Sequence, residues 1–147
     1  PYVLETSIGL DRMFLAVFSS SLKEEVLENN TTRKVLKIPT VLAPYKAAIL
    51  PLVKKDGLQE IANEIKNSLQ FEFNVIYDEK DAVGRRYRRQ DAIGTPFCIT
   101  VDHQTKEDQS VTMRYRDSMN QIRVPIDNLA TIINKETSMK FWLKKLY

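Results

Sequence analysis

The spacing of apolar residues changes along the chain between the helical period of about 3.6 and the strand period of about 2. Over residues 9–28 the apolar residues recur at helical spacing, which predicts a helix with one strongly apolar side. Residues 29–34 are polar and predict a loop. Pro39 and Pro44 follow and favour an extended, stiff linker into a second region.

Beyond this linker, short strand-like runs alternate with helical patterns. The predicted elements are a buried strand at 47–53, a helix at 58–69 capped by Asp56, a strand over 71–78, a helix at 84–93, a strand at 97–101, strands at 111–116 and 119–124, and a helix starting at Pro125. This order predicts an α/β fold with a mixed sheet. The first strands should run parallel through helical crossovers, and a hairpin should follow.

Residues 84–101 place a basic helix directly before an apolar strand. Arg85, Arg88 and Arg89 project from one side of the predicted helix, and Gly94 predicts its end. A cluster of guanidinium groups mounted beside a buried strand suits a polyanion, because guanidinium matches phosphate geometry. The alternative is a solvated charged face held by ordinary surface ion pairs.

Composition narrows the possible chemistry. The 147 residues carry a formal net charge of only +3, so local clustering rather than total charge points to a partner. Cys98 and His103 are the only residues of their types, which excludes an internal disulfide and a Cys–His metal site. We expect Cys98 to be an inert core residue and His103 to be solvated. No apolar run approaches about 20 residues, so we expect no membrane partner and a cytoplasmic setting.

The strands after residue 110 add further arginines. The strand at 111–116 alternates apolar and polar residues, which predicts a half-exposed strand with a basic face formed by Arg114 and Arg116. Arg123 lies on the predicted partner strand. Groups that can stack on bases or bond to base edges are found nearby, at Phe97, Asp102, Tyr115 and Gln121. These residues predict a nucleic-acid binder, with Asp102, Gln121 and one strand arginine reading base edges.

Three segments resemble one known family. They are APYKAAILPL at 43–52, GRRYRRQDAIGTP at 84–96 and RDSMNQIRV at 116–124. Together they resemble the C-terminal anticodon-binding domain of glycyl-tRNA synthetases of the dimeric class II type. The resemblance implies a five-stranded mixed sheet flanked by helices and tRNA(Gly) as the partner. With the pattern above, it places the anticodon contacts on Arg85, Arg88, Phe97, Asp102, Arg114, Arg116, Gln121 and Arg123.

Residues 5–12, ETSIGLDR, resemble motif 3 of the catalytic domain in its glycine-specific form, with departures at Thr6 and Asp11. The resemblance implies that Arg12 contacts ATP and that Glu5 and Ser7 line the glycine pocket. It implies that residues 1–28 end the catalytic domain, 29–44 form a linker and 45–147 form the anticodon-binding domain. The longer enzyme would use ATP and Mg²⁺ and form a homodimer through its catalytic domain. The chain alone is expected to bind neither cofactor and to be inactive.

Two other interpretations stay open. One is a non-catalytic accessory subunit of a mitochondrial DNA polymerase, against which Glu5, Ser7 and Arg12 argue. The other is the anticodon domain of a prolyl-, threonyl- or histidyl-tRNA synthetase, against which the motif 3 segment and residues 116–124 argue. If residues 1–28 end the catalytic domain of a glycyl-tRNA synthetase, the first helix is separated from the sheet that its apolar side would cover. We therefore expect that side to pack on its own domain or on a second copy.

Overall fold

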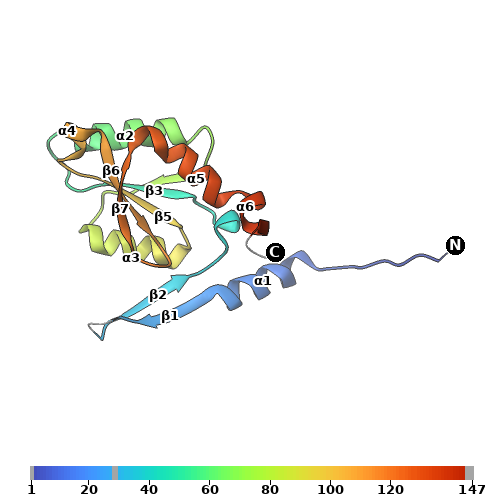
Figure 1. Ribbon diagram of the computed structural model, residues 1–147. Coiled ribbons are helices and arrows are strands. Elements are labelled where there is room, and N and C mark those ends of the chain that lie inside the picture. The colour runs from blue at the N-terminus through green and yellow to red at the C-terminus, as the bar shows by residue number, and fades with distance from the viewer. Residues whose placement is uncertain (1, 28–29, 145–147) are drawn as a thin grey trace.

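The computed structural model describes residues 2–27 and 30–144, which form a layered α/β body with an N-terminal arm (Figure 1). The helices are α1 (Leu10–Ser21), α2 (Leu58–Leu69), α3 (Val83–Ile93), α4 (Thr105–Asp108), α5 (Leu129–Thr137) and α6 (Met139–Lys144). The strands are β1 (Leu22–Val26), β2 (Thr32–Leu36), β3 (Ala47–Pro51), β4 (Val75–Tyr77), β5 (Phe97–Val101), β6 (Ser110–Tyr115) and β7 (Gln121–Pro125).

Strands β3 to β7 form one mixed sheet in the order β4-β3-β5-β6-β7. β3 runs parallel to β4 and to β5, whereas β6 is antiparallel to both β5 and β7. Parallel neighbours need crossover connections, and α2 and α3 supply them. The predicted fold class, an α/β fold with a five-stranded mixed sheet flanked by helices, is confirmed.

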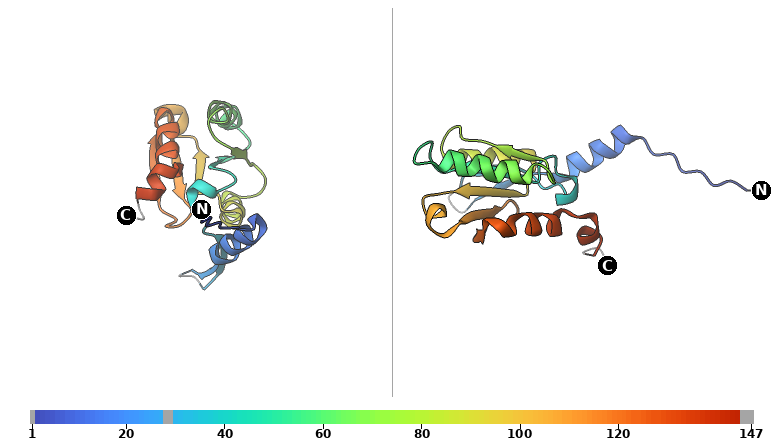
Figure 2. Two further views of the ribbon diagram at one scale, coloured as in Figure 1. Left: turned by 90° about the vertical axis from the view of Figure 1, so that its right-hand side faces the viewer. Right: turned by 90° about the horizontal axis from the view of Figure 1, so that it is seen from above.

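The two faces of this sheet are covered unequally. α2 and α5 bury their apolar residues against one face and form the main core with it. On the other face α3 covers a smaller apolar group, made by Ala48, Leu50 and Cys98 with Tyr87 packed against it. β3 and β5 are buried along their whole length, as expected for parallel strands between two helical layers. Figure 2 shows α3 on the opposite side of the sheet from α5.

The segment predicted as helix end, polar loop and linker contains a β-hairpin instead. The first helix ends at Ser21, and β1 follows at once and pairs antiparallel with β2. The predicted loop is therefore wrong from residue 32 onward. Arg33 and Val35 point inward on β2, and a buried arginine cannot be told from a loop residue by its polarity. Residues 28 and 29, where the predicted helix ends and the loop begins, lie outside the described residues.

Four smaller features also differ from the predictions. α2 begins after Gly57, whose left-handed backbone (φ 77°) stands where a cap by Asp56 was expected. β4 covers only Val75–Tyr77, and Phe71 is exposed in the turn before it. The polar turn after β5 contains α4, and Pro125 precedes a short 3-10 turn (Ile126–Asn128) rather than starting an α-helix. None of these changes moves the strand ends near the candidate site.

The arm, residues 2–21, leaves the body at the hairpin. Residues 2–9 run extended, and α1 leads from them into β1 without an intervening residue (Figure 1). The direction of the arm is therefore set where the hairpin attaches to the body. No helix in the described part of the chain is long and apolar enough to cross a membrane.

Candidate nucleic-acid interface

The outer side of α3 presents the arginines that the sequence singled out. Arg85 and Arg88 are exposed there, as their helical spacing predicts. Arg88 donates long hydrogen bonds to the carbonyl oxygen of Thr32 (3.2 Å) and the hydroxyl of Thr31 (3.3 Å). Arg89 is more firmly held, by carboxylates of the loop before α3. Arg85 and Arg88 are thus the α3 guanidinium groups that a new partner reaches with least loss of existing bonds.

Arg86 points the other way and is structural. It is 2% exposed, and its guanidinium donates to the carbonyl oxygens of Pro51 (2.6 Å), Leu52 (3.2 Å) and Asp78 (3.2 Å). These oxygens lie at the ends of β3 and β4, so Arg86 ties the start of α3 to the carboxyl edge of the parallel strands. Buried carbonyl oxygens need such donors.

The prediction that Arg114 stands on an exposed basic strand face is wrong. Arg114 is 6% exposed, and its terminal nitrogens donate to both oxygens of Asp91 (2.8 and 3.0 Å). Its guanidinium carbon lies 4.8 Å from the centre of the Tyr87 ring. A buried guanidinium needs acceptors for its N–H groups, and the Asp91 carboxylate supplies two and also balances the charge of Arg114. Arg114 therefore holds α3 to the sheet.

Arg116 and Phe97, two other predicted contacts, are also internal. Arg116 is 3% exposed and donates to the carbonyl oxygen of Gly94 (2.8 Å) and to the carboxylate of Asp117 (2.7 Å). Phe97 is 1% exposed and packs edge-on against Tyr115, with ring centroids 5.4 Å apart. The expectation that these two side chains face a nucleic acid is corrected, because core packing and main-chain bonds use both.

Asp102 and Arg123 form a partly exposed ion pair at the carboxyl end of β5. Arg123 donates to Asp102 (2.5 Å) and to the hydroxyls of Ser110 (2.7 Å) and Thr112 (3.1 Å). The side chains of Arg123 and Asp102 stay 28% and 22% exposed. Burial by itself raises the pKa of Asp102, but hydrogen bonds from Arg123 and from the Thr105 amide outweigh it and hold that pKa below 3.8. Asp102 is therefore an ionised acceptor at neutral pH.

Gln121 lies on the same face of the sheet as this pair. Gln121 and Arg123 are two residues apart on β7, so their side chains point to one side, and Gln121 is exposed. α3 occupies the neighbouring part of that face, because Arg114, the strand partner of Gln121, contacts α3. The structure therefore brings Asp102, Gln121 and Arg123 onto one sheet face beside α3.

Arg33 is a buried charged residue that the sequence interpretation missed. It is 3% exposed and donates to Asp91 (3.0 Å), to Glu25 (2.6 Å) and to the carbonyl oxygen of Arg116 (3.0 Å). Hydrogen bonds from Lys37 and Arg33 lower the pKa of Glu25 from its ordinary value of 4.5. The available signal was the alternation of β2, in which residues 33 and 35 share one side.

Cys98 and His103 lie outside this interface. Burial raises the pKa of the Cys98 thiol to about 12, which confirms the prediction of an inert core residue. His103 is exposed, with its Nδ1 atom 4.0 Å from the carboxylate of Asp56. Within residues 2–27 and 30–144, no three His, Cys, Asp or Glu side chains are grouped to hold a metal ion.

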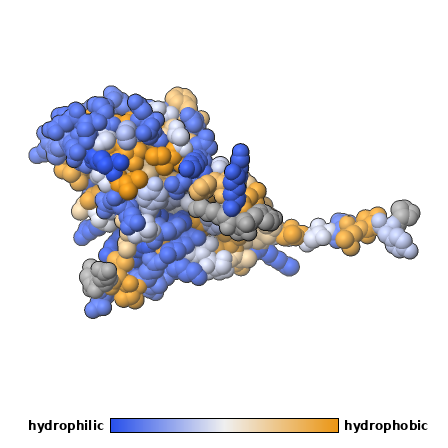
Figure 3. All heavy atoms as spheres, in the orientation of Figure 1, coloured by the Kyte–Doolittle hydropathy of each residue, from blue (hydrophilic) through white to orange (hydrophobic). Residues whose placement is uncertain are grey.

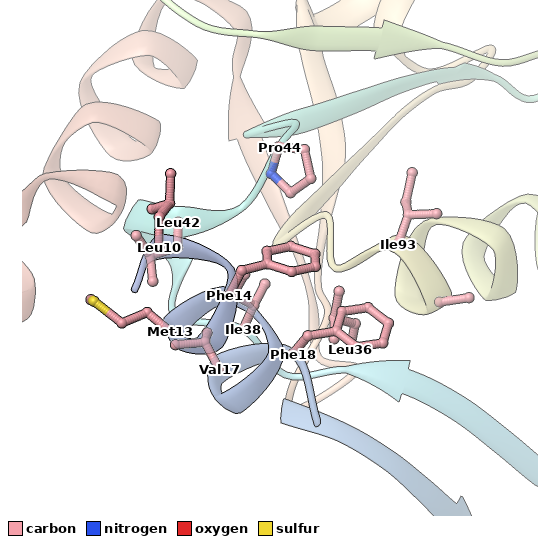
Figure 4. A pocket seen from close by; sticks show the side chains of 11 residues that line it. Leu10, Met13, Phe14, Val17, Phe18, Leu36, Ile38, Leu42, Pro44 and Ile93 are labelled. Atoms are coloured by element: carbon pink, nitrogen blue, oxygen red, sulfur yellow. The ribbon is translucent and has the colours of Figure 1, made fainter. Parts of the chain in front are cut away.

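The predicted ATP and glycine residues lie on the arm. Glu5, Ser7 and Arg12 are exposed, and the structure does not gather them into a pocket. α1 faces the body across an open groove of about 580 Å³ (Figure 4), whose apolar lining is Leu10, Met13, Phe14, Val17, Phe18, Leu36, Ile38, Leu42, Pro44, Ala92 and Ile93. Phe14 remains 67% exposed, so the expected packing of α1 on its own domain is only partial. Figure 3 shows the apolar residues that follow the arm away from the body.

Comparison with known proteins places these features in a family. The family described as anticodon binding domain matches residues 46–136. The chain is 47% identical over 136 residues to a glycine–tRNA ligase from Borrelia hermsii and 52% identical over 134 residues to one from Mycoplasma capricolum subsp. capricolum. The matches cover 92% and 91% of this chain but 31% and 29% of the relatives. The chain therefore spans about a third of the length of these curated relatives.

A solved structure of prolyl-tRNA synthetase from Cryptosporidium parvum, complexed with halofuginone and AMPPNP, superimposes with a TM-score of 0.64 at 25% identity. The match covers 77% of this chain and 24% of that one. The resemblance to glycyl-tRNA synthetases is confirmed by the relatives of that name. With its five-stranded mixed sheet and the match over residues 46–136, the chain belongs to the anticodon binding domain family.

Proposed function

We propose that this chain is the anticodon-binding portion of a glycine–tRNA ligase and that it binds the anticodon loop of tRNA(Gly). The observation that carries the proposal is 47–52% identity to glycine–tRNA ligases over 91–92% of the chain. The prolyl-tRNA synthetase shares the fold at only 25% identity, which favours the glycyl enzyme over the prolyl, threonyl and histidyl alternatives. The relatives' names also favour a ligase over a polymerase accessory subunit.

The anticodon loop of the tRNA would lie on the sheet face beside α3. In the sheet, β3 lies between β4 and β5. The chain goes from β3 to β4 on one side and then returns to β5 on the other side, so the strand order reverses between β3 and β5. Such a switch point is where α/β sheets commonly bind ligands. Asp102 and Arg123 stand at that edge, and Gln121 lies further along the same face. Carboxylate, guanidinium and amide groups bond to the edges of unstacked bases, so these three side chains would read the anticodon.

Arg85 and Arg88 would supply the part of binding that does not depend on sequence. Exposed guanidinium groups contact phosphates, fix the position of the strand and make affinity depend on salt. Arg114 and Arg116 would act indirectly, since their bonds hold α3 and the end of β6 in place.

The chemistry of the whole enzyme belongs to the same proposal. Arg12 would contact ATP through a charge-assisted bond, and Glu5 and Ser7 would line the glycine pocket, where a carboxylate suits the ammonium group. These three residues are exposed on the arm, so they do not form that site by themselves. Mg²⁺ would neutralise phosphate charge when bound; in the described part of the chain no three His, Cys, Asp or Glu side chains are grouped to hold it. The enzyme would be a cytoplasmic homodimer joined by its catalytic domain.

The test is binding of this chain to a panel of anticodon stem-loops that differ only in the anticodon. We expect a preference for glycine anticodons that Gln121→Ala flattens, since one good base contact is worth about 1–3 kcal/mol of discrimination. Gln70→Ala is the matched control, because Gln70 is also exposed but lies at the end of α2, which covers the other sheet face.

Equal affinity of the unchanged chain for every anticodon would contradict the proposal. An equal loss for all anticodons in Gln121→Ala would instead assign Gln121 to structure or to phosphate contact. The two results are distinguishable because the first needs no substitution.

A further inference from the structure

Arg33 joins three elements of the structure at one buried point. Its guanidinium contacts Glu25 on β1, Asp91 on α3 and the carbonyl oxygen of Arg116 at the end of β6. Its side chain is 2% exposed, and that of Asp91 is 1% exposed. A guanidinium has a rigid fork of donors, so one that bonds in three directions fixes the relative position of the groups that accept from it.

Asp91 extends this junction into the sheet. Its carboxylate accepts from Arg33 and also from both terminal nitrogens of Arg114 on β6. One carboxylate therefore faces two buried guanidinium groups. Glu25 supplies a second negative charge to Arg33 and is also paired with Lys37. Arg33 and Glu25 both belong to the hairpin, so the bonds of Arg33 to Asp91 and to the carbonyl oxygen of Arg116 are the ones that join the hairpin to the body.

Steric fit at Gly94 gives an independent sign that the hairpin is part of the body. A Cβ atom at Gly94 would lie 2.9 Å from Cγ2 of Ile38 and 3.1 Å from the carbonyl oxygen of Leu36. The chain leaving β2 thus packs directly on the end of α3, where a side chain would not fit. With the bonds of Arg88 to Thr31 and Thr32, the hairpin follows one stripe of α3 from residue 88 through 91 to 94.

The same hairpin carries the arm. α1 continues into β1 with no residue between them, and the carbonyl oxygen of Ser21, the last residue of α1, accepts from the amide of Lys37 just after β2. Under the proposed function, Arg12 on α1 contacts ATP. The hairpin then lies between the surface that binds the anticodon and the helix that serves the reaction.

We infer that Arg33 is a positioning residue, which locks the β1–β2 hairpin and the arm that it carries to the anticodon-binding sheet as one rigid body. This inference rests on the proposed function. Glycine activation needs only ATP and glycine, whereas transfer to tRNA needs the acceptor end at the reaction site while the anticodon is held on the sheet. The relative placement of arm and sheet therefore matters for transfer and not for activation.

The experiment compares Arg33→Met with Lys34→Met in the full-length ligase. Methionine keeps the apolar part of Arg33, and the buried Asp91–Arg114 pair remains. Lys34 is the matched control, since it is the next residue of β2 and is exposed. The readouts are amide hydrogen exchange of β1 and β2, stem-loop binding, glycine-dependent pyrophosphate exchange, and glycine transfer at saturating tRNA.

In Arg33→Met we expect amides of β1 and β2 to exchange at least about tenfold faster while those of β5 and β6 keep their protection. Stem-loop affinity and pyrophosphate exchange should stay within about twofold, and transfer should fall by about tenfold or more. Lys34→Met should match the unchanged enzyme throughout. If Arg33→Met fails to fold, Glu25→Gln loosens only the β1 side and should show the same pattern more weakly.

If amide hydrogen exchange of the hairpin stayed unchanged in both Arg33→Met and Glu25→Gln, the proposed lock would be overturned. Loss of pyrophosphate exchange in step with transfer would overturn the positioning role and leave Arg33 as a general stabiliser. If the unchanged enzyme did not attach glycine to tRNA at all, the proposed function would fail. Amide hydrogen exchange of β1 and β2 would still decide whether the hairpin is locked to the sheet.

Discussion

On the outer side of α3, Arg85 is exposed and Arg88, also exposed, makes only long bonds to the edge of the hairpin, whereas on the side packed against the hairpin and the sheet Asp91 is buried between Arg33 and Arg114. Guanidinium groups thus occur in two settings around one helix: exposed on α3 itself, and buried against its Asp91. An exposed guanidinium can exchange water for a phosphate at little cost, while a buried one already has fixed acceptors that a ligand would have to replace. The difference assigns recognition to the outer side and rigidity to the inner side.

The largest effect should come from breaking the inner side. Asp91→Ala leaves two buried guanidinium groups without their shared carboxylate, so we expect a loss of about 3–5 kcal/mol in the free energy of unfolding. Urea unfolding of this chain measures it. Asp81→Asn is the control, since it removes the charge that pairs with Arg89 at the exposed start of α3, keeps a side chain that tolerates the left-handed backbone there (φ 71°), and should change stability little.

A loss in Asp91→Ala no greater than that in Asp81→Asn would show that the inner side is not the rigid one. It would also weaken the case for Arg33 as a positioning residue, because the lock passes through Asp91.

The inner side is also the part of the molecule that the sequence concealed. Alternation placed Arg114 on the side of β6 opposite to Met113, which is correct. It could not show that α3 covers that side, because the covering carboxylate is 23 positions away in sequence. Arg33 was hidden in the same way, since its partner Asp91 is 58 positions away. Buried ion pairs are set by tertiary contact, so local polarity assigned both arginines to solvent.

The sheet and the outer side of α3 were predictable for the opposite reason. The continuous apolar run of β3 and the alternation of β5 report burial from neighbouring residues alone. Helical periodicity likewise placed Arg85 and Arg88 outward, and the left-handed C-terminal residue was evident as Gly94. The prediction that Asp102, Gln121 and one strand arginine read base edges stays a prediction; the structure places Asp102, Gln121 and Arg123 on one sheet face, and only Gln121 and Arg123 share that face through their two-residue spacing on β7.

A smaller difference in stability should separate alanine substitutions at Gly84, in the first turn of α3, and at Gly94, its C-terminal cap. Gly94→Ala places a side chain at φ 84°, which costs about 1–2 kcal/mol for an L-residue, and the close contacts with Ile38 and Leu36 add to that cost. Gly84→Ala meets no atom within 4 Å and lies in the first turn of the helix, so it should stabilise by up to about 1 kcal/mol. Thermal or urea unfolding of the two variants measures both changes in stability, a loss for Gly94→Ala and a gain for Gly84→Ala.

A Gly94→Ala variant as stable as the unchanged chain would contradict this prediction, because both the left-handed backbone at residue 94 and the contacts with Ile38 and Leu36 oppose a side chain there. Hydrogen exchange of β2 in that variant tests the contacts separately, since a hairpin displaced by the methyl group would exchange faster.

The smallest effect on stability should come from the outer side, where Arg85→Ala combined with Arg88→Ala removes two exposed charges and only the long bonds from Arg88 to the hairpin. Binding should respond instead. For single-stranded RNA, each lost phosphate contact lowers the slope of log affinity against log salt by about 0.7, so the pair should lower it by roughly 1.4.

The matched control is Lys135→Ala with Lys140→Ala, two exposed cations on α5 and α6. Both double variants remove two positive charges from the formal net charge of +3, so overall attraction falls alike. A slope that falls equally in both would mean that binding depends on total charge and not on α3. A slope unchanged in the arginine variant would remove the outer side of α3 from the interface and leave recognition to Asp102, Gln121 and Arg123 alone.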